Sequence, residues 1–346
     1  MLSRWLKLAG KVIRSNLDRL KSPYKLTYVV TKECHSRCLN CEIWKVKPEN
    51  ELTLGEVELL AKNSPFLSWV DFTGGEPTDR QDFVELVNVF CRNCSDLLFV
   101  HFPTNGLKTR RIVQVAGEIV KRSGRRLIIT VSIDGPPELN DRLRGIAGDF
   151  RQAVETYRRL KTLNGVSVYI GMTLYADNVF SIEETVKAIQ AEIPSFGYRD
   201  LHINLGHLSD HYYGNHSLKK IQTEALTLAV DNYIKKRGMV ITPFELVERM
   251  YQKRIKTYLE SGLCPQRCAA LMASCYLAED GTVYPCALWN KPLGNIRDSS
   301  YSLLELLHSK EANELRAEII CKKCPNCWTP CEAYQTLAAN LLRRGQ

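Results

Sequence analysis

Residues 31–44 have the sequence Thr31-Lys-Glu-Cys34-His-Ser-Arg-Cys38-Leu-Asn-Cys41-Glu-Ile-Trp44, and this stretch decides the interpretation of the chain. Its three cysteines, Cys34, Cys38 and Cys41, have C-x3-C-x2-C spacing. A [4Fe–4S] cluster is normally held by four thiolates, so three at this spacing predict a cluster with one iron open to a small molecule. A zinc site or three unrelated thiols are the alternatives. Zinc needs a fourth ligand nearby, and His35, next to a cysteine, is poorly placed to complete a tetrahedron.

A glycine pair follows about 33 residues after the third cysteine, in Val70-Asp-Phe-Thr-Gly74-Gly75-Glu76-Pro77. An apolar run ends here in two glycines, a carboxylate and a proline. The glycines let the backbone come close to a ligand, and a carboxylate there can accept hydrogen bonds from an ammonium group. An ordinary turn would explain these four residues alone, but their place after the cysteines favours a shared site.

Six segments have the composition of strands: Leu26–Thr31, Trp69–Thr73, Leu97–Pro103, Leu127–Ile133, Ser167–Leu174 and Asp200–Leu205. Helical patterns lie between them, at Leu54–Lys62, Gln81–Cys91, Arg110–Arg122, Phe150–Leu163 and Ile182–Ile193. Thr53 and Glu56 form a capping box before the first of these helices. Alternating strands and helices predict parallel strands with right-handed crossovers. Six units rather than eight predict an α/β fold, a partial (β/α)6 TIM-type barrel.

The motifs fall where such a barrel places its binding residues, at the carboxyl ends of the strands. The cysteine stretch, Gly74–Pro77, Thr104–Gly106 and Ser132–Gly135 all follow predicted strands. Ser132 and Asp134 are two residues apart and therefore point to the same side of a strand. Their hydroxyl and carboxylate suit the vicinal hydroxyls of a ribose.

Eight further cysteines lie in the C-terminal third: Cys264, Cys268, Cys275, Cys286, Cys321, Cys324, Cys327 and Cys331. The last four have the C-x2-C-x2-C-x3-C spacing of two-cluster ferredoxins, and a zinc knuckle is the alternative. We therefore expect a small cysteine-rich C-terminal domain. The pair Cys91 and Cys94 has no third or fourth partner nearby in the sequence and reads as two free or half-buried thiols.

Together the motifs strongly resemble those of radical S-adenosylmethionine (radical SAM) enzymes, and Gly281-Thr-Val-Tyr-Pro-Cys286 resembles the SPASM extension that carries auxiliary clusters. The resemblance implies that SAM binds the open iron and is cleaved reductively to a 5′-deoxyadenosyl radical, which removes a hydrogen atom from the substrate. It also implies a low-potential electron donor of the ferredoxin or flavodoxin type. The residues implied to bind SAM are Gly74, Gly75, Glu76, Pro77, Thr104, Asn105, Ser132, Asp134 and Arg144.

The same resemblance implies one auxiliary [4Fe–4S] cluster on Cys286 and Cys331 with two of the three cysteines Cys264, Cys268 and Cys275. A second would use Cys321, Cys324 and Cys327 with the cysteine that remains. The chain departs from the family in lacking a wider gap in the last run and a cysteine after it, so we expect one or two auxiliary clusters. It also has Asn40 where the family often has an aromatic residue beside the adenine; Trp44 is a substitute.

Length and composition fit one large and one small domain, since the chain has 346 residues, 45% of them hydrophobic and 25% charged. We divide it into an N-terminal helix (1–22), a partial barrel (23–240) and an auxiliary-cluster domain (241–346). No apolar run reaches the roughly 18–20 residues of a membrane-spanning helix, and residues 1–12 do not resemble a signal peptide. Thirteen cysteines in metal-type clusters indicate metal binding in a reducing cytoplasm rather than disulfides.

The N-terminal arm is strongly basic. Residues 1–25 contain seven Lys or Arg and one acid, a net charge of 7 − 1 = +6 out of +9 for the chain. Apolar residues recur at steps of three and four, at Leu2, Trp5, Leu6, Ala9, Val12, Ile13, Leu17 and Leu20. This pattern predicts an amphipathic helix with one apolar stripe. The helix either closes the bottom of the barrel or lies on an anionic membrane through residues 1–21.

The substrate is left open by the sequence. A membrane lipid, such as an isoprenoid chain that is cross-linked or modified, is the leading hypothesis because of the N-terminal helix. A peptide or protein is the alternative; RNA and a non-enzymatic iron–sulfur carrier rank lower. Histidines at 202, 207 and 211 either contact substrate or lie on an exposed polar loop. We expect a cytoplasmic location, at the inner face of the membrane under the lipid hypothesis.

Overall fold

The computed structural model describes residues 2–219, 221–240 and 242–343. Six strands form its central sheet: β1 Lys25–Thr31, β2 Trp69–Gly74, β3 Phe99–Thr104, β4 Arg126–Ser132, β5 Val166–Leu174 and β6 Leu201–Leu205. The helices around them are α2 Leu54–Lys62, α3 Phe83–Asn93, α4 Thr109–Ser123, α5 Pro137–Arg144, α6 Asp149–Lys161 and α7 Ile182–Glu192. The remaining elements are α1 Leu2–Asn16, α8 Thr223–Arg237, α9 Pro243–Ser261, β7 Ser274–Leu277, β8 Thr282–Tyr284, β9 Gly294–Asn295, α10 Leu303–Leu307, α11 Lys310–Ile320 and α12 Pro330–Ala339.

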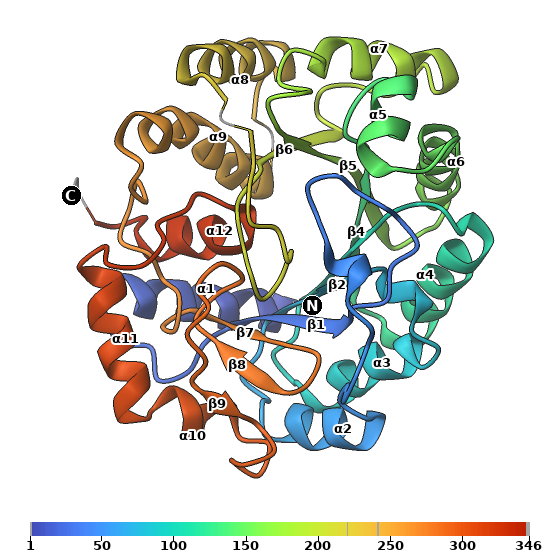
Figure 1. Cartoon of the computed structure of the whole chain (residues 1–346). Coiled ribbons are helices and arrows are strands. Elements are labelled where there is room, and N and C mark those ends of the chain that lie inside the picture. The colour runs from blue at the N-terminus through green and yellow to red at the C-terminus, as the bar shows by residue number, and fades with distance from the viewer. Residues whose placement is uncertain (1, 220, 241, 344–346) are drawn as a thin grey trace.

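The first six strands are parallel and lie in the order β6-β5-β4-β3-β2-β1. They curve into an open barrel with the helices on the outside (Figure 1), and side chains on their inner face line a cavity. The predicted partial barrel is therefore confirmed, and each predicted strand agrees with the observed one to within two residues. Helix α5, which follows the Ser132–Gly135 segment, was not predicted. The capping box is present, with the Glu56 amide donating to Thr53 Oγ1.

Strand β3 shows why the interior is hollow. Its outward residues are buried beneath the helices, whereas the inward residues Phe99, His101 and Pro103 are only half-buried. Alternate residues of a strand point to opposite faces. The half-buried positions therefore border the space inside the barrel, while the buried ones form the hydrophobic core between sheet and helices.

The C-terminal region extends the sheet instead of forming a detached unit. Strand β7 pairs in parallel with β1, and β8 and β9 continue as an antiparallel hairpin and short edge strand. On the other side of the barrel, Tyr233 of α8 donates to the carbonyl of Leu201 in β6. Trp328, just before α12, donates to the carbonyl of Tyr251 in α9 at 2.8 Å. Helices α8, α9 and α12 thus cover the open side of the barrel (Figure 1).

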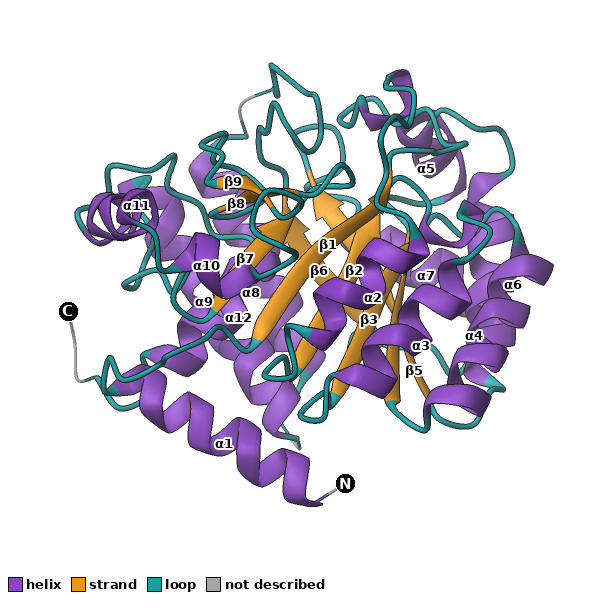
Figure 2. Cartoon of the chain, turned by 90° about the horizontal axis from the view of Figure 1, so that it is seen from below, coloured by secondary structure: helices purple, strands orange, loops and turns teal. Residues whose placement is uncertain are grey.

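Helix α1 lies across the end of the barrel where the strands begin (Figure 2). Lys11 Nζ donates to the carbonyl of Phe66 at 2.5 Å, and Arg4 Nε donates to that of Ser95 at 3.1 Å. Both acceptors lie shortly before a strand, β2 and β3 respectively. The helix therefore closes the bottom of the barrel, as one of the two sequence hypotheses predicted.

Candidate active site

The cysteine loop lies at the carboxyl end of β1, over the hollow of the barrel. Cys34, Cys38 and Cys41 all line the same cavity, whose volume is about 310 Å³. Two backbone hydrogen bonds of 2.9 Å fix the loop, from Arg37 to the carbonyl of Arg144 and from Leu39 to that of Leu143. The unpredicted helix α5 therefore holds the cysteine loop in place.

The electrostatics of the loop suit a bound cluster of irons. Burial raises the pKa of Cys34 to about 11 and that of Cys41 to about 12, and it raises the pKa of Cys38 too. Without a metal the thiols therefore stay protonated at neutral pH. The positive charge of the Arg144 guanidinium acts in the opposite direction and offsets part of this rise in pKa for all three thiols. Three thiols on one cavity beside a buried cation match the donor set of an iron–sulfur cluster.

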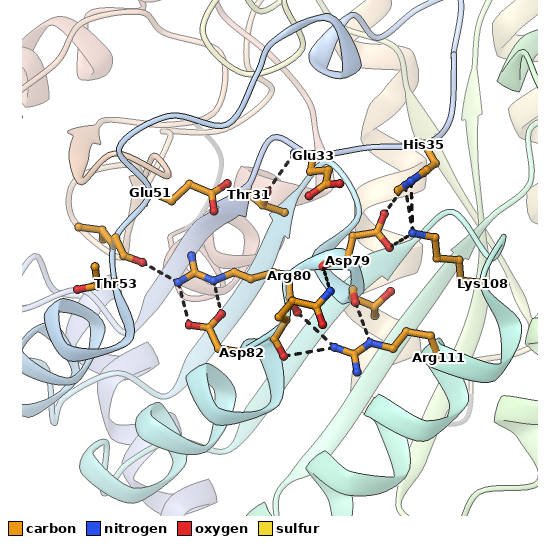
Figure 3. Close-up of a pocket in the computed structure, with 13 residues that line it drawn as sticks. Thr31, Glu33, His35, Glu51, Thr53, Asp79, Arg80, Asp82, Lys108 and Arg111 are labelled. Carbon is orange, nitrogen blue, oxygen red and sulfur yellow. Dashed lines mark hydrogen bonds and ion pairs between the residues drawn. The ribbon is translucent and has the colours of Figure 1, made fainter.

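His35 is held away from the cavity in a second, larger hollow of about 710 Å³ on the outside of the loop (Figure 3). Its Nδ1 lies 2.6 Å from Asp79 Oδ2, and Lys108 Nζ lies 2.8 Å from Asp79 Oδ1. The imidazole points toward this carboxylate, so His35 is not available as a fourth ligand. In this hollow Arg80 likewise pairs with Asp82 at 2.7 Å. These ion pairs brace the loop from outside.

The glycine pair packs against the beginning of the cysteine loop. The Gly75 amide donates to Thr31 O at 2.9 Å and the Glu76 amide to Glu33 O at 2.7 Å. A Cβ on Gly74 would lie 2.1 Å from Thr31 O, and one on Gly75 would lie 2.0 Å from Glu33 O. The close approach that requires glycine is thus to the backbone that carries the cysteines. The predicted contact of this segment with SAM stays a prediction.

We expect Gly75→Ala to displace the cysteine loop, because the new methyl group would overlap a backbone carbonyl that cannot rotate away. The variant should retain less than about half of the wild-type iron after anaerobic reconstitution, measured by iron analysis and the visible absorption of the clusters. Gly117→Ala, in the interior of α4, is the matched control, since nothing lies within 4 Å of its added Cβ. It should keep full iron and gain up to about 1 kcal/mol of stability. Equal iron in the two variants would contradict the prediction.

Glu76 joins the ends of β2 and β3. Its carboxylate is buried and accepts hydrogen bonds from the Asn105 amide at 2.7 Å, from Thr104 Oγ1 at 3.0 Å and from Thr78 Oγ1 at 2.7 Å. Burial raises the pKa of this carboxyl. The structure thus brings three of the predicted SAM-binding residues, Glu76, Thr104 and Asn105, into direct contact. Thr104 and Asn105 also line the cavity.

Ser132, Asp134 and Arg144 lie around the same cavity. Asp134 Oδ1 accepts a hydrogen bond from the amide of Thr173 in β5, and its Oδ2 lies 3.3 Å from Arg144 Nη1. Burial alone would lower the pKa of Arg144, but Cys38 and the neighbouring carboxylates raise it overall. Arg144 thus couples the cysteine loop to the predicted ribose position. Its expected contact with the SAM carboxylate stays a prediction.

A polar layer, which the sequence analysis missed, lies inside the barrel. His101 Nδ1 is 3.1 Å from Asp71 Oδ1, and His101 Nε2 is 3.0 Å from Thr130 Oγ1. Lys25 Nζ lies 2.9 Å from the other oxygen of Asp71. His101 and Thr130 lie two residues before Pro103 and Ser132 on the same strand faces. The layer is therefore directly beneath the predicted SAM-binding residues and borders the cavity.

His202, His207 and His211 are more buried than an exposed loop would be, whereas His216 is exposed. His202 stacks on Tyr169 at 4.3 Å, and burial lowers its pKa to about 4. Its imidazole is therefore neutral at pH 7. Together with Asn204 it lines the cavity. His211 instead stacks on Tyr284 of β8 at 4.4 Å, against the C-terminal region.

The C-terminal cysteines do not all lie together. Burial raises the pKa of Cys327, and the charges of Cys286 and Cys268 add to this shift, which places these three thiols near one another. Cys331 lines the barrel cavity, and Cys321 is exposed at the end of α11. Within the described ranges, no three His, Cys, Asp or Glu side chains are close enough to bind a single metal ion. Eight cysteines lie in this region, and all of them except Cys321 are buried or half-buried. Thiols in this setting match the donor chemistry of iron–sulfur clusters.

Comparison with known families identifies the class. A family model of the radical SAM superfamily matches residues 28–189, and one of the SPASM iron–sulfur cluster-binding domain matches residues 268–328. The chain therefore carries a radical SAM domain followed by a SPASM domain. Its cofactors are 4Fe–4S clusters and SAM.

Three curated relatives show which proteins it is similar to. The sporulation killing factor maturation protein SkfB of Bacillus subtilis is 25% identical over 288 residues, 80% of this chain and 63% of that protein. The AdoMet-dependent heme synthase of Oleidesulfovibrio alaskensis is 25% identical over 295 residues, 80% of this chain and 72% of that protein. The mycofactocin maturase MftC of Mycobacterium tuberculosis is 30% identical over 173 residues, 48% and 41% of the two chains. The chain thus spans less than two thirds of the first and third relatives.

Solved structures show the same fold. The chain superposes on anSMEcpe with bound AdoMet with a TM-score of 0.63, at 17% identity, over 93% of this chain and 98% of that one. For Streptococcus suis SuiB bound to S-adenosylmethionine the TM-score is 0.60, at 15% identity, over 89% and 71% of the two chains. At these identities the similarity supports the fold alone.

None of the described helices is both long enough and apolar enough to cross a membrane.

Proposed function

We propose that this enzyme abstracts a hydrogen atom from an unactivated C–H bond of a peptide or protein. Cys34, Cys38 and Cys41 would hold the SAM-cleaving cluster, and Glu76, Thr104, Asn105, Ser132, Asp134 and Arg144 would surround SAM. When bound, the reduced cluster and SAM supply a primary carbon radical strong enough to break such a bond, which no general base can deprotonate. A low-potential ferredoxin or flavodoxin would supply the electron.

The observation that carries the substrate class is the mixed lining of the barrel interior, in which polar groups lie among aromatic side chains such as Trp69, Tyr169 and Phe244. Beneath the cysteine loop, the cavity is lined by Asp71, His101, Thr130, His202 and Asn204. Asp71, His101 and Thr130 already pair with one another, but an alkyl chain in this space would leave the buried Nε2 of His202 without a hydrogen bond, at a cost of roughly 1–3 kcal/mol. A peptide brings amide and side-chain groups that can pair with this nitrogen.

The relatives support the same choice, because the printed names of SkfB and MftC describe maturation proteins and SuiB has been solved with its precursor peptide SuiA. The heme synthase shows that the same fold also serves other substrates. The lipid hypothesis that led the sequence analysis gains no support from these relatives or from the cavity. We therefore rank the peptide first and retain the lipid as an arm of the test.

The test uses the full chain, reconstituted anaerobically, reduced with dithionite and supplied with SAM. One arm adds a pool of synthetic peptides with randomised positions, and the other adds vesicles of extracted isoprenoid lipids. We expect 5′-deoxyadenosine to rise above the substrate-free background only with peptides, together with products that have lost two hydrogen atoms by mass spectrometry. A rise with the lipid vesicles alone would overturn the proposal.

A further inference from the structure

Helix α1 has two apolar faces, whereas the sequence analysis assigned it one stripe. The inner face packs on the protein: Leu8 and Val12 contact a cluster that contains Tyr24, and the Trp5 ring meets Phe99 edge to face at 5.2 Å. The outer face is uncovered. Its residues Leu2, Leu6 and Ile13 are 74%, 66% and 53% exposed, and Leu17, directly after the helix, is 53% exposed. Closing the barrel therefore uses only half of the apolar surface of this segment.

The outer residues form one continuous surface. Positions 2, 6, 9 and 13 recur at helical steps of three and four and share one side of the helix. The chain end adds to it, because the Leu342 amide donates to Asn16 Oδ1 at 2.8 Å. Leu341 and Leu342 are themselves 48% and 66% exposed. A contiguous apolar patch of this kind marks an interaction surface.

The surroundings of this patch are basic. Eight cations lie along or beside α1: Arg4, Lys7, Lys11, Arg14, Arg19, Lys21, Arg267 and Arg343. The carboxylates that pair with them are Asp18 and Asp96, so the local charge is 8 − 2 = +6. Arg14 and Arg19 are exposed and make no ion pair with any residue that the structure describes. Lys7 and Arg14 lie along one border of the apolar face.

We propose that the outer face of α1 docks the enzyme on an anionic membrane surface, with the helix in the plane of the interface and the four exposed apolar side chains among the lipids. An apolar face bordered by Lys and Arg is the pattern of interfacial helices, and anionic lipids attract the cations. A second copy of this chain fits less well, because two patches of the same positive charge repel each other.

The orientation that follows separates this inference from the choice of substrate. Helix α1 lies at the end of the barrel where the strands begin, and the cysteine loop lies at the opposite end (Figure 2). Docking through α1 would point the mouth of the barrel toward water. A membrane-bound enzyme would then still meet a water-soluble peptide, so membrane docking and peptide modification are independent and can fail separately.

Vesicle co-sedimentation of the full chain tests the proposal. Wild type should pellet with vesicles of phosphatidylcholine and phosphatidylglycerol and far less with phosphatidylcholine alone. Leu6→Glu/Ile13→Glu should weaken the partitioning by about tenfold or more, since both charges enter the interface. Arg14→Gln/Arg19→Gln should weaken it only for the anionic vesicles. Leu228→Glu, at a 57% exposed position on α8, is the matched control and should bind like wild type.

Two results with vesicles would overturn the proposal. One is wild type that stays in the supernatant with anionic vesicles at low salt. The other is equal pelleting of wild type and Leu6→Glu/Ile13→Glu, with the fold of the variant confirmed by circular dichroism. Light scattering in solution provides a third such result. If wild type is a dimer and Leu6→Glu/Ile13→Glu is a monomer, the outer face of α1 binds a second copy of the chain.

Discussion

Replacing Cys34, Cys38 and Cys41 together by alanine will abolish SAM cleavage. The three thiols share one cavity, and the neighbouring His35 cannot replace them because it is turned outward to Asp79. The variant should lose about four of the roughly 8–12 irons of the reconstituted enzyme and keep those of the SPASM region. Iron, sulfide and 5′-deoxyadenosine are the quantities to measure, anaerobically and with dithionite.

The matched control is Cys91→Ala/Cys94→Ala, which also removes thiols. Both residues are buried in the core around α3, and Cys94 Sγ donates to the carbonyl of Ser64 at 3.2 Å. This variant should lose a little stability and no iron. Persistent 5′-deoxyadenosine in the triple variant, at a rate near that of the control, would refute the assignment of the first three cysteines.

The sequence predicted those features that are local along the chain. The barrel strands have β-branched and aromatic residues and end in glycine, proline or cysteine motifs, so their number and ends follow from composition and turn chemistry. The cysteine loop and the Gly74–Pro77 segment were found for the same reason. The sequence could not show that Gly75 is required by the carbonyl of Glu33. That contact joins two segments 42 positions apart and depends on how β1 and β2 pair.

The polar layer of the interior escaped prediction for a related reason. Asp71, His101 and Thr130 are polar residues in the middle of three largely apolar strands, and each one alone looks like an ordinary exception. They meet because Asp71 is the register partner of His101 in neighbouring parallel strands. Alternation of half-buried and buried residues along β3 is the signal that could have pointed to this layer. Likewise, the sequence alone does not show which apolar residues of α1 pack on the barrel and which stay exposed, because this depends on how the helix lies against the bottom of the barrel.

The buried ion pair at the bottom of this layer gives the second large prediction. Lys25 is fully buried, and its Nζ lies 2.9 Å from Asp71 Oδ2 and 2.6 Å from the carbonyl of Cys331 in α12. We expect Lys25→Met to lower the free energy of unfolding by about 3–5 kcal/mol at pH 7.5, because it leaves the Asp71 carboxylate buried without its cation. Lys25→Met/Asp71→Asn should recover most of this loss. Lys21→Met, at an exposed position, should change it by less than about 0.5 kcal/mol.

The dependence of this effect on pH distinguishes a charge effect from a packing effect. Burial raises the pKa of Asp71, but Lys25 and His101 lower it more, so in the wild type the carboxyl stays ionised below its usual range. Its stabilising contribution is complete above the unfolded-state pKa of about 4 and is lost as the pH falls below that value. Without Lys25 the pKa of Asp71 rises, and the carboxyl takes up a proton on folding in mildly acidic solution. The difference in unfolding free energy between wild type and Lys25→Met should therefore shrink between pH 7.5 and pH 5 in anaerobic urea unfolding. A difference that is constant with pH would mean that Lys25 acts through its packing on Trp69 and α12.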